Sequence, residues 1–330
     1  MAFSGDALCE LAAQFLALAE KQTATAPFMV GHRVMGASLL FTGDIAQGRA
    51  HFDQALALYD PAEHRPLATR FGQDVRVSIL SFRSVALWVL GYPETALVDA
   101  ERTLKDAREI GQAATLMYAL SIVPATYCWR GNYVETKTLA EEAIALAEEK
   151  RILFWKGLGM MHRGSVMALT GKASDAAQMI TSGITAWRST GATVWLPIFL
   201  PLLAMAHAEL GQFDDAWRCI GEAMTAVEIS KESFCEAEIH RRAGEITLKS
   251  SRPDAAKAGG YFERALAVAR KQQSKSWELR AAMSMARLWR DQGKRDEARE
   301  LLAPVYGWFT EGFDTLDLKE AKELLDKLAS

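Results

Sequence analysis

Three arginines near the end of the chain have side chains and spacing that could bind an anion. Arg280, Arg287 and Arg290 stand at i, i+7 and i+10, close to one face of a helix, and Met283 falls on the same face. The planar guanidinium of arginine can hold two oxygens of a carboxylate or a phosphate at once. The row therefore predicts a clamp for acidic side chains or phosphate. The alternative is a solvated basic face that neighbouring acidic residues partly neutralise.

Aromatic and sulfur-containing side chains form a second candidate lining. The sequence has nine tryptophans, and several large side chains lie on or beside stretches with helical spacing: Trp88, Tyr118, Trp129, Trp155, Met161 and Trp195. Such residues would suit a groove for an amphipathic helix or an apolar ligand. Packing in the core is the alternative, because large apolar side chains are usually buried. Together with the arginine row, the residues expected in the groove are Trp88, Tyr118, Trp129 and Met161.

The motifs that would bind a phosphate or a dinucleotide are incomplete. LTGKAS (169–174) lacks the first glycine of a P-loop and the hydroxyl residue after its lysine. Gly157 and Gly159 imitate the start of a dinucleotide fingerprint, but no strand pattern precedes them and the third glycine is missing. HExxH and GxSxG are also absent from the sequence. We therefore expect no catalytic residues and no cofactor, and a binding protein rather than an enzyme.

The six histidines do not have the spacing of metal ligands. A metal site needs two or three converging side chains, so we expect none. His207 is predicted to lie in a packed core, whereas His162 and His240 are candidates to face a groove. In the stretch 60–74, Asp60, His64 and Asp74 could coordinate an ion, although a polar loop with turn residues explains them more simply.

Composition narrows the class of protein. The chain has 330 residues, a net charge of -3 and four cysteines without CxxC spacing, which argues against nucleic-acid binding, a zinc site and a disulfide framework. The longest apolar stretch, 194–206, contains two prolines and is too short to span a bilayer. No secretory signal pattern opens the chain. We expect a cytoplasmic protein that binds neither nucleic acid nor membrane.

A repeat with a period of about 40 residues runs through the sequence. It is marked by a glycine that recurs between two stretches of helical spacing, at Gly43, Gly91, Gly131, Gly171, Gly211 and Gly293, with Pro253 in the place where one glycine is missing. Glycine adopts the left-handed conformation that ends one helix and lets the chain reverse. The pattern therefore predicts pairs of antiparallel helices.

Small residues follow each marker at fixed distances, which predicts close packing within each pair. Five residues on come Gly48, Ala96, Thr136, Ala176, Ala216, Ala258 and Ala298, and twelve on come Ala55, Thr103, Ala143, Gly183, Ala223, Ala265 and Val305. These positions share one face of the second helix, where a small side chain lets the first helix approach. This is the tetratricopeptide pattern, although that family's repeat is about 34 residues long.

The expected fold is all-α, a right-handed superhelical α-solenoid. One domain, 1–330, comprises a half-repeat helix at 5–22, seven helix pairs over 28–309 and a capping helix at 316–329. First helices are expected near 28–42, 73–90, 113–130, 152–170, 195–210, 234–250 and 276–292. Second helices are expected near 44–59, 93–110, 133–150, 173–189, 213–230, 255–272 and 294–309. No linker divides the array, and 60–74 is the one long insertion.

The sequence resembles the C-terminal tetratricopeptide region of bacterial proteins that join a class III adenylate or guanylate cyclase to an ATPase module. The likeness is carried by the segments 264–328, 50–74 and ALWVLGYPETAL (86–97), and it is close in the first of these and looser in the middle repeats. The resemblance implies a regulatory, partner-sensing module without the catalytic activities. A weaker resemblance is to the helical repeats of the maltose-regulon activator, which bind an inducer.

Two functions follow as expectations. The first is a non-enzymatic scaffold whose concave groove binds a protein segment or peptide, or a cyclase or ATPase domain, in bacterial signalling. The second is a small-molecule sensor that uses the aromatic groove. The sequence leaves the identity of the partner open.

Overall fold

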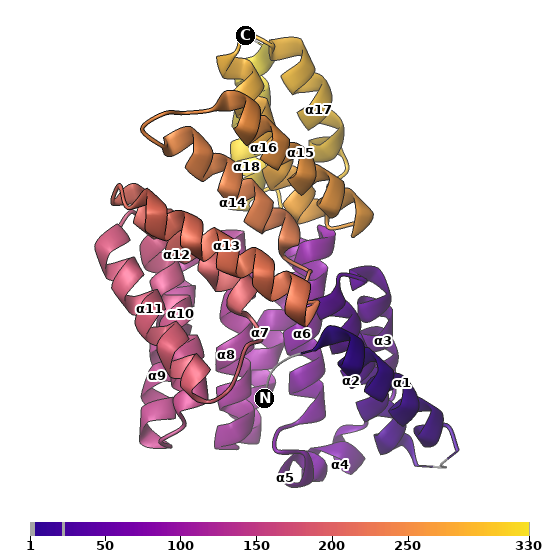
Figure 1. Ribbon diagram of the computed structural model, residues 1–330. Helices are drawn as coiled ribbons and strands as arrows, with labels where there is room; N and C mark the ends of the chain where they lie inside the picture. Colours follow the sequence, from indigo (N-terminus) through magenta and orange to yellow (C-terminus); the bar gives the residue numbers. More distant parts are fainter. Residues whose placement is uncertain (1–3, 22–23, 330) are drawn as a thin grey trace.

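The described chain is a series of antiparallel helix pairs. The computed structural model describes residues 4–21 and 24–329, and every regular element in these ranges is a helix (Figure 1). Helix α1 (Gly5–Ala19) comes first. The first helices of the seven pairs are α2 (Thr25–Thr42), α6 (Val75–Leu90), α8 (Ala113–Arg130), α10 (Leu153–Leu169), α12 (Leu196–Glu209), α14 (Glu236–Lys249) and α16 (Lys275–Asp291). The second helices are α3 (Ile45–Ala57), α7 (Pro93–Ile110), α9 (Tyr133–Glu149), α11 (Ala173–Ser189), α13 (Phe213–Ser230), α15 (Ala255–Lys271) and α17 (Arg295–Gly307). Helix α18 (Leu316–Ala329) packs on α16 and α17.

The predicted α-solenoid is confirmed, and the helix ends lie within about one turn of their predicted positions. All six marker glycines have positive φ, between 75° at Gly211 and 95° at Gly91. Each therefore makes the reversal between two helices of a pair. Within the described ranges, no helix combines the length and the apolar character needed to cross a bilayer.

The small residues of the repeat lie in the contact between the two helices of each pair. Ala96, Ala176, Ala216, Ala258 and Ala298 are completely buried. The backbones of α10 and α11 approach closely, so that a Cβ on Gly183 would lie 2.9 Å from the carbonyl oxygen of Gly157. The register deduced from the sequence therefore describes how the pairs pack.

The insertion between the first two pairs is short helix rather than open loop. It forms α4 (Pro61–His64), the 3-10 helix η1 (Arg65–Leu67) and α5 (Ala68–Phe71). Asp60 caps α4 by accepting a hydrogen bond from the Ala62 amide at 2.7 Å, and Asp74 caps α6 by accepting one from the Val77 amide at 3.0 Å. The His64 ring accepts from the Asp60 amide at 2.9 Å. These side chains therefore cap and connect the short helices of the insertion.

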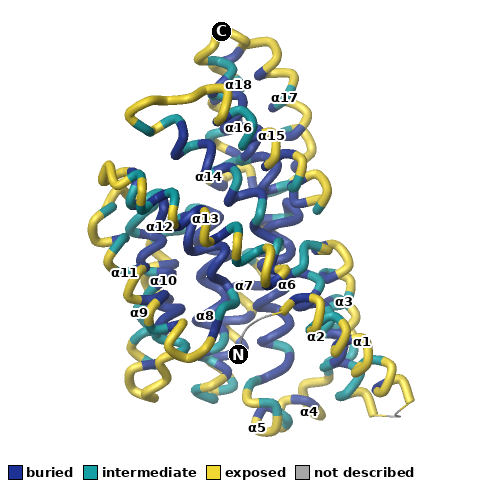
Figure 2. The backbone as a smooth tube through the Cα atoms, in the orientation of Figure 1, coloured by how far each residue is buried: buried dark blue, intermediate teal, exposed yellow. Residues whose placement is uncertain are grey.

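The last pair of the superhelix folds back on the second pair (Figure 1), and aromatic side chains occupy part of the expected concave groove. Helix α16 of the last pair contacts α6 of the second pair. The ring of Trp277 lies 4.7 Å from that of Trp88 and 5.5 Å from that of Trp129. Figure 2 shows that α6 and α8 are mostly buried in the centre of the molecule. In the predicted arrangement, the first helices line an open groove. In the structure, α6, α8 and α16 instead meet through the rings of Trp88, Trp129 and Trp277.

A second contact between distant repeats joins the start of α7 to the loop before α18. Glu311 Oε1 accepts hydrogen bonds from the amides of Glu94 and Thr95, both at 2.9 Å. In return, Glu94 Oε2 accepts one from the Gly312 amide at 3.1 Å. A carboxylate at a helix N-terminus satisfies unpaired amides and is favoured by the helix dipole. We call this reciprocal contact of residues 94–95 with 311–312 the closing contact.

A buried carboxyl group at the junction of α13 and α14 makes stability depend on pH. Glu232 is fully buried, and both of its oxygens accept from the Trp195 amide, at 2.9 and 3.1 Å. Burial raises the pKa of Glu232 to about 8, although the hydrogen bond from Trp195 opposes the shift. Because the folded state binds this proton more tightly than the unfolded state does, stability falls as pH rises from the unfolded pKa toward 8.

Replacing Glu232 with glutamine should remove this loss, because the amide is neutral and can still accept from Trp195. We expect the Glu232→Gln protein to melt on the order of 5 °C above wild type at pH 8.5 and close to it at pH 5. Thermal unfolding at the two pH values is the measurement, and Glu228→Gln, at an exposed site of α13, is the matched control. An equal difference at both pH values would contradict the ionisation argument.

Candidate functional site

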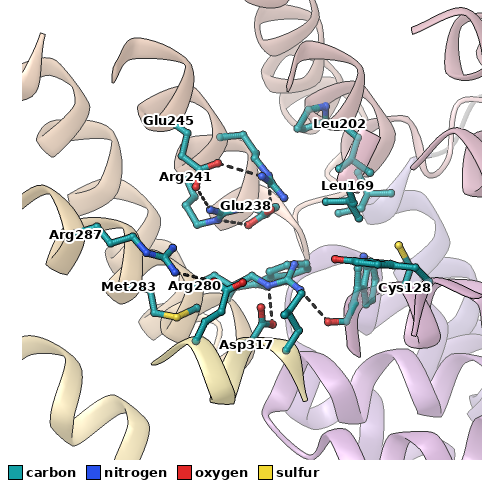
Figure 3. Close-up of a pocket in the computed structure, with 18 residues that line it drawn as sticks. Cys128, Leu169, Leu202, Glu238, Arg241, Glu245, Arg280, Met283, Arg287 and Asp317 are labelled. Atoms are coloured by element: carbon teal, nitrogen blue, oxygen red, sulfur yellow. Dashed lines mark hydrogen bonds and ion pairs between the residues drawn. The ribbon is translucent and has the colours of Figure 1, made fainter. Parts of the chain in front are cut away.

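A cavity of about 300 Å³ remains at the centre of the closed superhelix. Seven helices contribute to its walls, namely α8, α9, α10, α12, α14, α16 and α18, and Figure 3 shows the lining residues. The apolar part consists of Cys128, Trp129, Tyr133, Leu169, Ile198, Pro201, Leu202, Trp277, Met283 and Leu316. The charged part consists of Glu238, Arg241, Arg242, Glu245, Arg280, Arg287, Asp317 and Glu320. The cavity therefore combines a pair of apolar walls with a charge-balanced surface.

Arg280 is anchored in the cavity wall by hydrogen bonds and by aromatic rings. Its Nε donates to Asp317 Oδ2 at 2.8 Å, and its Nη2 donates to the Trp129 carbonyl at 2.9 Å. The guanidinium also lies 4.9 Å from the ring centroid of Trp88 and 5.2 Å from that of Trp277. Burial alone would lower the pKa of Arg280, but the Asp317 carboxylate outweighs it and the pKa is raised. Arg280 is thus held in place from several sides while charged.

Helix α14 supplies a second set of ion pairs. Arg241 donates to Glu238 at 2.6 Å and also pairs with Glu245. Arg242 donates to the same two carboxylates, at 2.8 and 3.1 Å. Burial would raise the pKa of Glu238, but the two arginines outweigh it and lower the pKa. Figure 3 shows Glu238, Arg241 and Glu245 on the opposite side of the cavity from Asp317.

The acidic ligand that the arginine row predicts is already present inside the molecule. Asp317 pairs with Arg280, and Glu320 pairs with Arg287 at 2.7 Å. Both carboxylates belong to α18, where they stand at i and i+3. In this conformation the chain's own last helix therefore occupies the positions where an acidic partner would bind.

The structure brings together half of the residues expected in the groove. Arg280, Met283, Arg287 and Trp129 line the cavity. Arg290 lies apart from them and pairs with Asp291 on its own helix at 2.8 Å. Binding at this cavity through the four lining residues stays a prediction.

The other aromatic and sulfur-containing candidates lie outside the cavity. Trp88 is 1% exposed and Met161 is completely buried, so neither side chain can contact a partner directly in this conformation. Core packing, the alternative for both, describes their place. Tyr118 packs edge-on against Trp155 at 5.8 Å and is hydrogen-bonded to Ser78 at 3.2 Å.

The histidines have structural roles. His162 is buried, with Nε2 3.0 Å from the Ser121 carbonyl, and burial lowers its pKa to about 4. It therefore faces the core rather than a groove. His207 Nδ1 lies 2.7 Å from Gln212 Oε1, and His240 lies 3.8 Å from Glu236. Among the described residues, no three side chains of the metal-binding types converge.

The ion pairs of α14 have a signal in the sequence, but it is typical of an exposed helix face. Glu238, Arg241, Arg242 and Glu245 stand at i, i+3, i+4 and i+7, which places them on one helix face. Opposite charges at this spacing usually mark a solvated surface. What the sequence does not show is that this face turns toward the inside of the superhelix.

Comparison with known proteins supports the fold and does not place the chain in a family. No family model matches the sequence. An uncharacterized protein of Rhizobium meliloti (strain 1021) is 26% identical over 236 residues, which are 71% of this chain and 23% of that protein. The chain thus corresponds to less than a quarter of the relative's length.

Solved structures with a similar fold are repeat proteins of low sequence identity. A Rap protein complexed with competence and sporulation factor aligns with a TM-score of 0.64 and 10% identity, covering 97% of this chain and 81% of that one. The apo form of the quorum sensor NprR from B. thuringiensis gives 0.53 and 14%, covering 91% and 81%. The APC/C hetero-tetramer Cut9-Hcn1 gives 0.56 and 14%, covering 98% and 58%. These likenesses show a tetratricopeptide-like solenoid.

Proposed function

We propose that this chain is a non-enzymatic recognition module whose central cavity binds a short protein segment and passes the signal to a partner domain. The observation that carries the proposal is the position of the cavity, which is walled by α8 on one side and by α16 and α18 on the other. A ligand there contacts repeats far apart in the chain at the same time. Any ligand that prefers one spacing of these repeats shifts the superhelix toward it.

The lining favours a segment that offers both apolar and polar groups. Trp129, Trp277 and Leu202 can enclose an apolar side chain, while the arginines and carboxylates can bind backbone or charged groups. The volume of about 300 Å³ suits the end of a peptide or a few side chains rather than a long helix. The similar Rap protein is complexed with competence and sporulation factor, which supports ligand binding by a fold of this kind.

The context of the proposal is cyclase- or ATPase-linked signalling in the bacterial cytoplasm, with residues 1–330 acting as one domain. Its support is the resemblance of segments such as 264–328 to the regulatory repeats of cyclase–ATPase proteins. The partner domain in this context is a cyclase or ATPase domain.

The size of the cavity favours a second candidate, a small-molecule inducer. Ligand pockets of small molecules have volumes of roughly 300–1,000 Å³ and bury most of their ligand. The cavity lies at the lower end of this range. An inducer would use the same walls, so the two candidates differ in the ligand and not in the site.

A substitution that fills the cavity should show whether a ligand binds in the cavity or elsewhere on the protein. Leu202 lines the cavity, and Leu202→Trp should weaken binding at least tenfold while adding a strain of about 1–3 kcal/mol. Thermal shift with pooled random pentapeptides and with a metabolite panel is the measurement. Leu210→Trp, at a residue 41% exposed and outside the cavity, is the control.

A shift with peptides that Leu202→Trp abolishes supports the proposal. A shift with metabolites alone, lost in the same variant, would favour the inducer. Ligand binding that survives Leu202→Trp unchanged would overturn both.

A further inference from the structure

A second cavity, of about 380 Å³, lies where the last repeats pack on the first ones. Its walls come from α3 of the first pair, from the end of α6 and the turn after it, from the end of α15 and from the start of α16. The described residues that line it are all different from those that line the central cavity. We call it the seam pocket, and its charged and aromatic side chains are Arg49, Tyr92, Arg270, Lys275 and Trp308.

The turn at Gly91 brings the aromatic side chains of the seam pocket together. A Cβ at Gly91 would lie 2.6 Å from Cζ3 of Trp308 and 2.7 Å from Cβ of Lys275, so the absence of a side chain lets both approach this turn. Tyr92 comes directly after it, and its ring lies 5.7 Å from that of Trp308. The aromatic part of the pocket therefore forms only when the last repeats pack on the second pair.

The seam pocket has more cations than carboxylates. Its described lining includes Arg49, Arg270 and Lys275 and no carboxylate. Within the described chain, Arg270 and Lys275 each make one side-chain hydrogen bond, and both donate to the buried Glu278, at 2.9 and 2.7 Å. A guanidinium has five N–H donors and an ammonium has three. Two cations thus share one carboxylate and keep donors for a bound anion.

Arg49 is only loosely paired with a carboxylate. Its Nε is buried and has no hydrogen-bond partner among the described residues. Its ion pair with Asp53 is long, at 3.6 Å, whereas the other oxygen of that carboxylate accepts from Arg83 at 2.6 Å. The planar guanidinium of Arg49 can therefore bind the oxygens of a phosphate.

The cations of the seam pocket lie beside aromatic rings. The Arg49 guanidinium is 5.1 Å from the ring centroid of Tyr92, and Lys275 Nζ is 5.5 Å from that of Trp308. Trp308 is 38% exposed although its side chain is large and apolar. A nucleobase can stack on such a ring. The pocket thus offers an aromatic surface and phosphate-binding groups next to each other.

We propose that the seam pocket binds a mononucleotide, with the base against Trp308 and Tyr92. The phosphate pairs with Arg49, Arg270 and Lys275. The volume lies within the range of small-molecule sites, roughly 300–1,000 Å³. The bound ligand contacts the first, second, sixth and seventh pairs at the same time, so it favours the conformation in which these pairs meet. This site is independent of the ligand proposed for the central cavity.

Isothermal titration calorimetry of the full chain with the four common ribonucleoside monophosphates tests the proposal. The nucleotide that binds most tightly is compared with its nucleoside and with ribose phosphate. We expect the nucleotide to bind at least tenfold more tightly than either half. Trp308→Leu should weaken nucleotide binding at least about fivefold, through the loss of base stacking, and leave the binding of ribose phosphate unchanged.

The double variant Arg49→Gln/Arg270→Gln should weaken nucleotide binding at least tenfold, because it removes two of the three cations. Arg264→Gln is the matched control, since it removes an exposed arginine of α15 outside the pocket, and it should bind as wild type does. Melting curves without ligand show that the variants fold. Trp308→Leu changes a partly exposed side chain and decides the test if the double variant does not fold.

Three results would overturn the proposal. The first is the failure of all four nucleotides to bind wild type at millimolar concentration. The second is equal nucleotide binding by wild type and by the folded variants. The third is inorganic phosphate or ribose phosphate binding as tightly as the nucleotide, which would show an anion site without a place for a base.

Discussion

Arg280→Ala should destabilise the folded protein by about 3 kcal/mol, because it leaves a largely buried carboxylate without its cation. The side chains of Arg280 and Asp317 are only 14% and 17% exposed. The substitution also removes the hydrogen bond to the Trp129 carbonyl and the contacts with the rings of Trp88 and Trp277. Urea unfolding at pH 7.5, with wild type as reference, measures the loss.

The pH dependence of this loss identifies its cause. Burial already raises the pKa of Asp317, and Arg280 limits that shift. Without Arg280 the folded pKa rises further, so the carboxyl group takes up a proton at mildly acidic pH and the penalty shrinks. The difference between wild type and Arg280→Ala should therefore be smaller at pH 5 than at pH 7.5.

Two further variants control the experiment. Arg280→Met/Asp317→Leu removes both charges and should recover much of the stability, since a buried ion pair can be replaced by apolar side chains of similar volume. Arg290→Ala removes an arginine of the same helix whose partner Asp291 is 64% exposed, and should cost less than about 0.5 kcal/mol. If Arg280→Ala cost no more than Arg290→Ala, the anchoring role of Arg280 would be excluded.

Gly312→Ala should open the closing contact and destabilise the protein by about 2–4 kcal/mol. Gly312 has φ 73°, and a Cβ there would lie 2.3 Å from Cγ of Pro93. The loop would have to move away from α7, which breaks the hydrogen bonds of Glu311 to the amides of Glu94 and Thr95. Urea unfolding measures the loss, and small-angle scattering should show a larger radius of gyration.

Gly293→Ala is the matched control for the backbone effect. Gly293 has φ 81°, but a Cβ there would have nothing within 4 Å. It should therefore show only the cost of a left-handed alanine, about 1 kcal/mol. The difference in unfolding free energy between the two variants therefore measures the contribution of the closing contact. Equal losses, with an unchanged radius of gyration for both, would mean that the contact does not hold the superhelix closed.

The parts of the fold that the sequence predicts are those set by short-range spacing. The turn at Gly131 and the buried residues Thr136 and Ala143 lie within one repeat. Local backbone geometry requires glycine at the turn, and close helix packing requires small side chains at the two buried positions. A period of about 40 residues also places the helix ends of the seven pairs within about one turn, although not the short helices of the insertion. Local rules therefore suffice for the helix pairs.

The closed shape and the cavity depend on contacts that have no periodic signal. Glu311 accepts a hydrogen bond from Thr95, which lies 216 positions away in the sequence. On its own, Glu311 has the pattern of an exposed acid, and Thr95 has that of a helix start. Of the arginine row, Arg280 and Arg287 line the cavity, but Asp317 of the capping helix pairs with Arg280. For Trp88 the helical spacing is the same in a groove and in a core, so only the closure of the superhelix decides between them.

The closing contact also sets an order of events during synthesis. Helix pairs form from neighbouring segments, so they can assemble one after another as the chain emerges. The amides at the start of α7 receive their carboxylate only after residue 311 has been made, more than two hundred positions later. Contacts of such long sequence separation form slowly. Until then the rings of Trp88 and Trp129 lack the cover of Trp277. A nascent chain therefore exposes these two large apolar side chains for most of its translation.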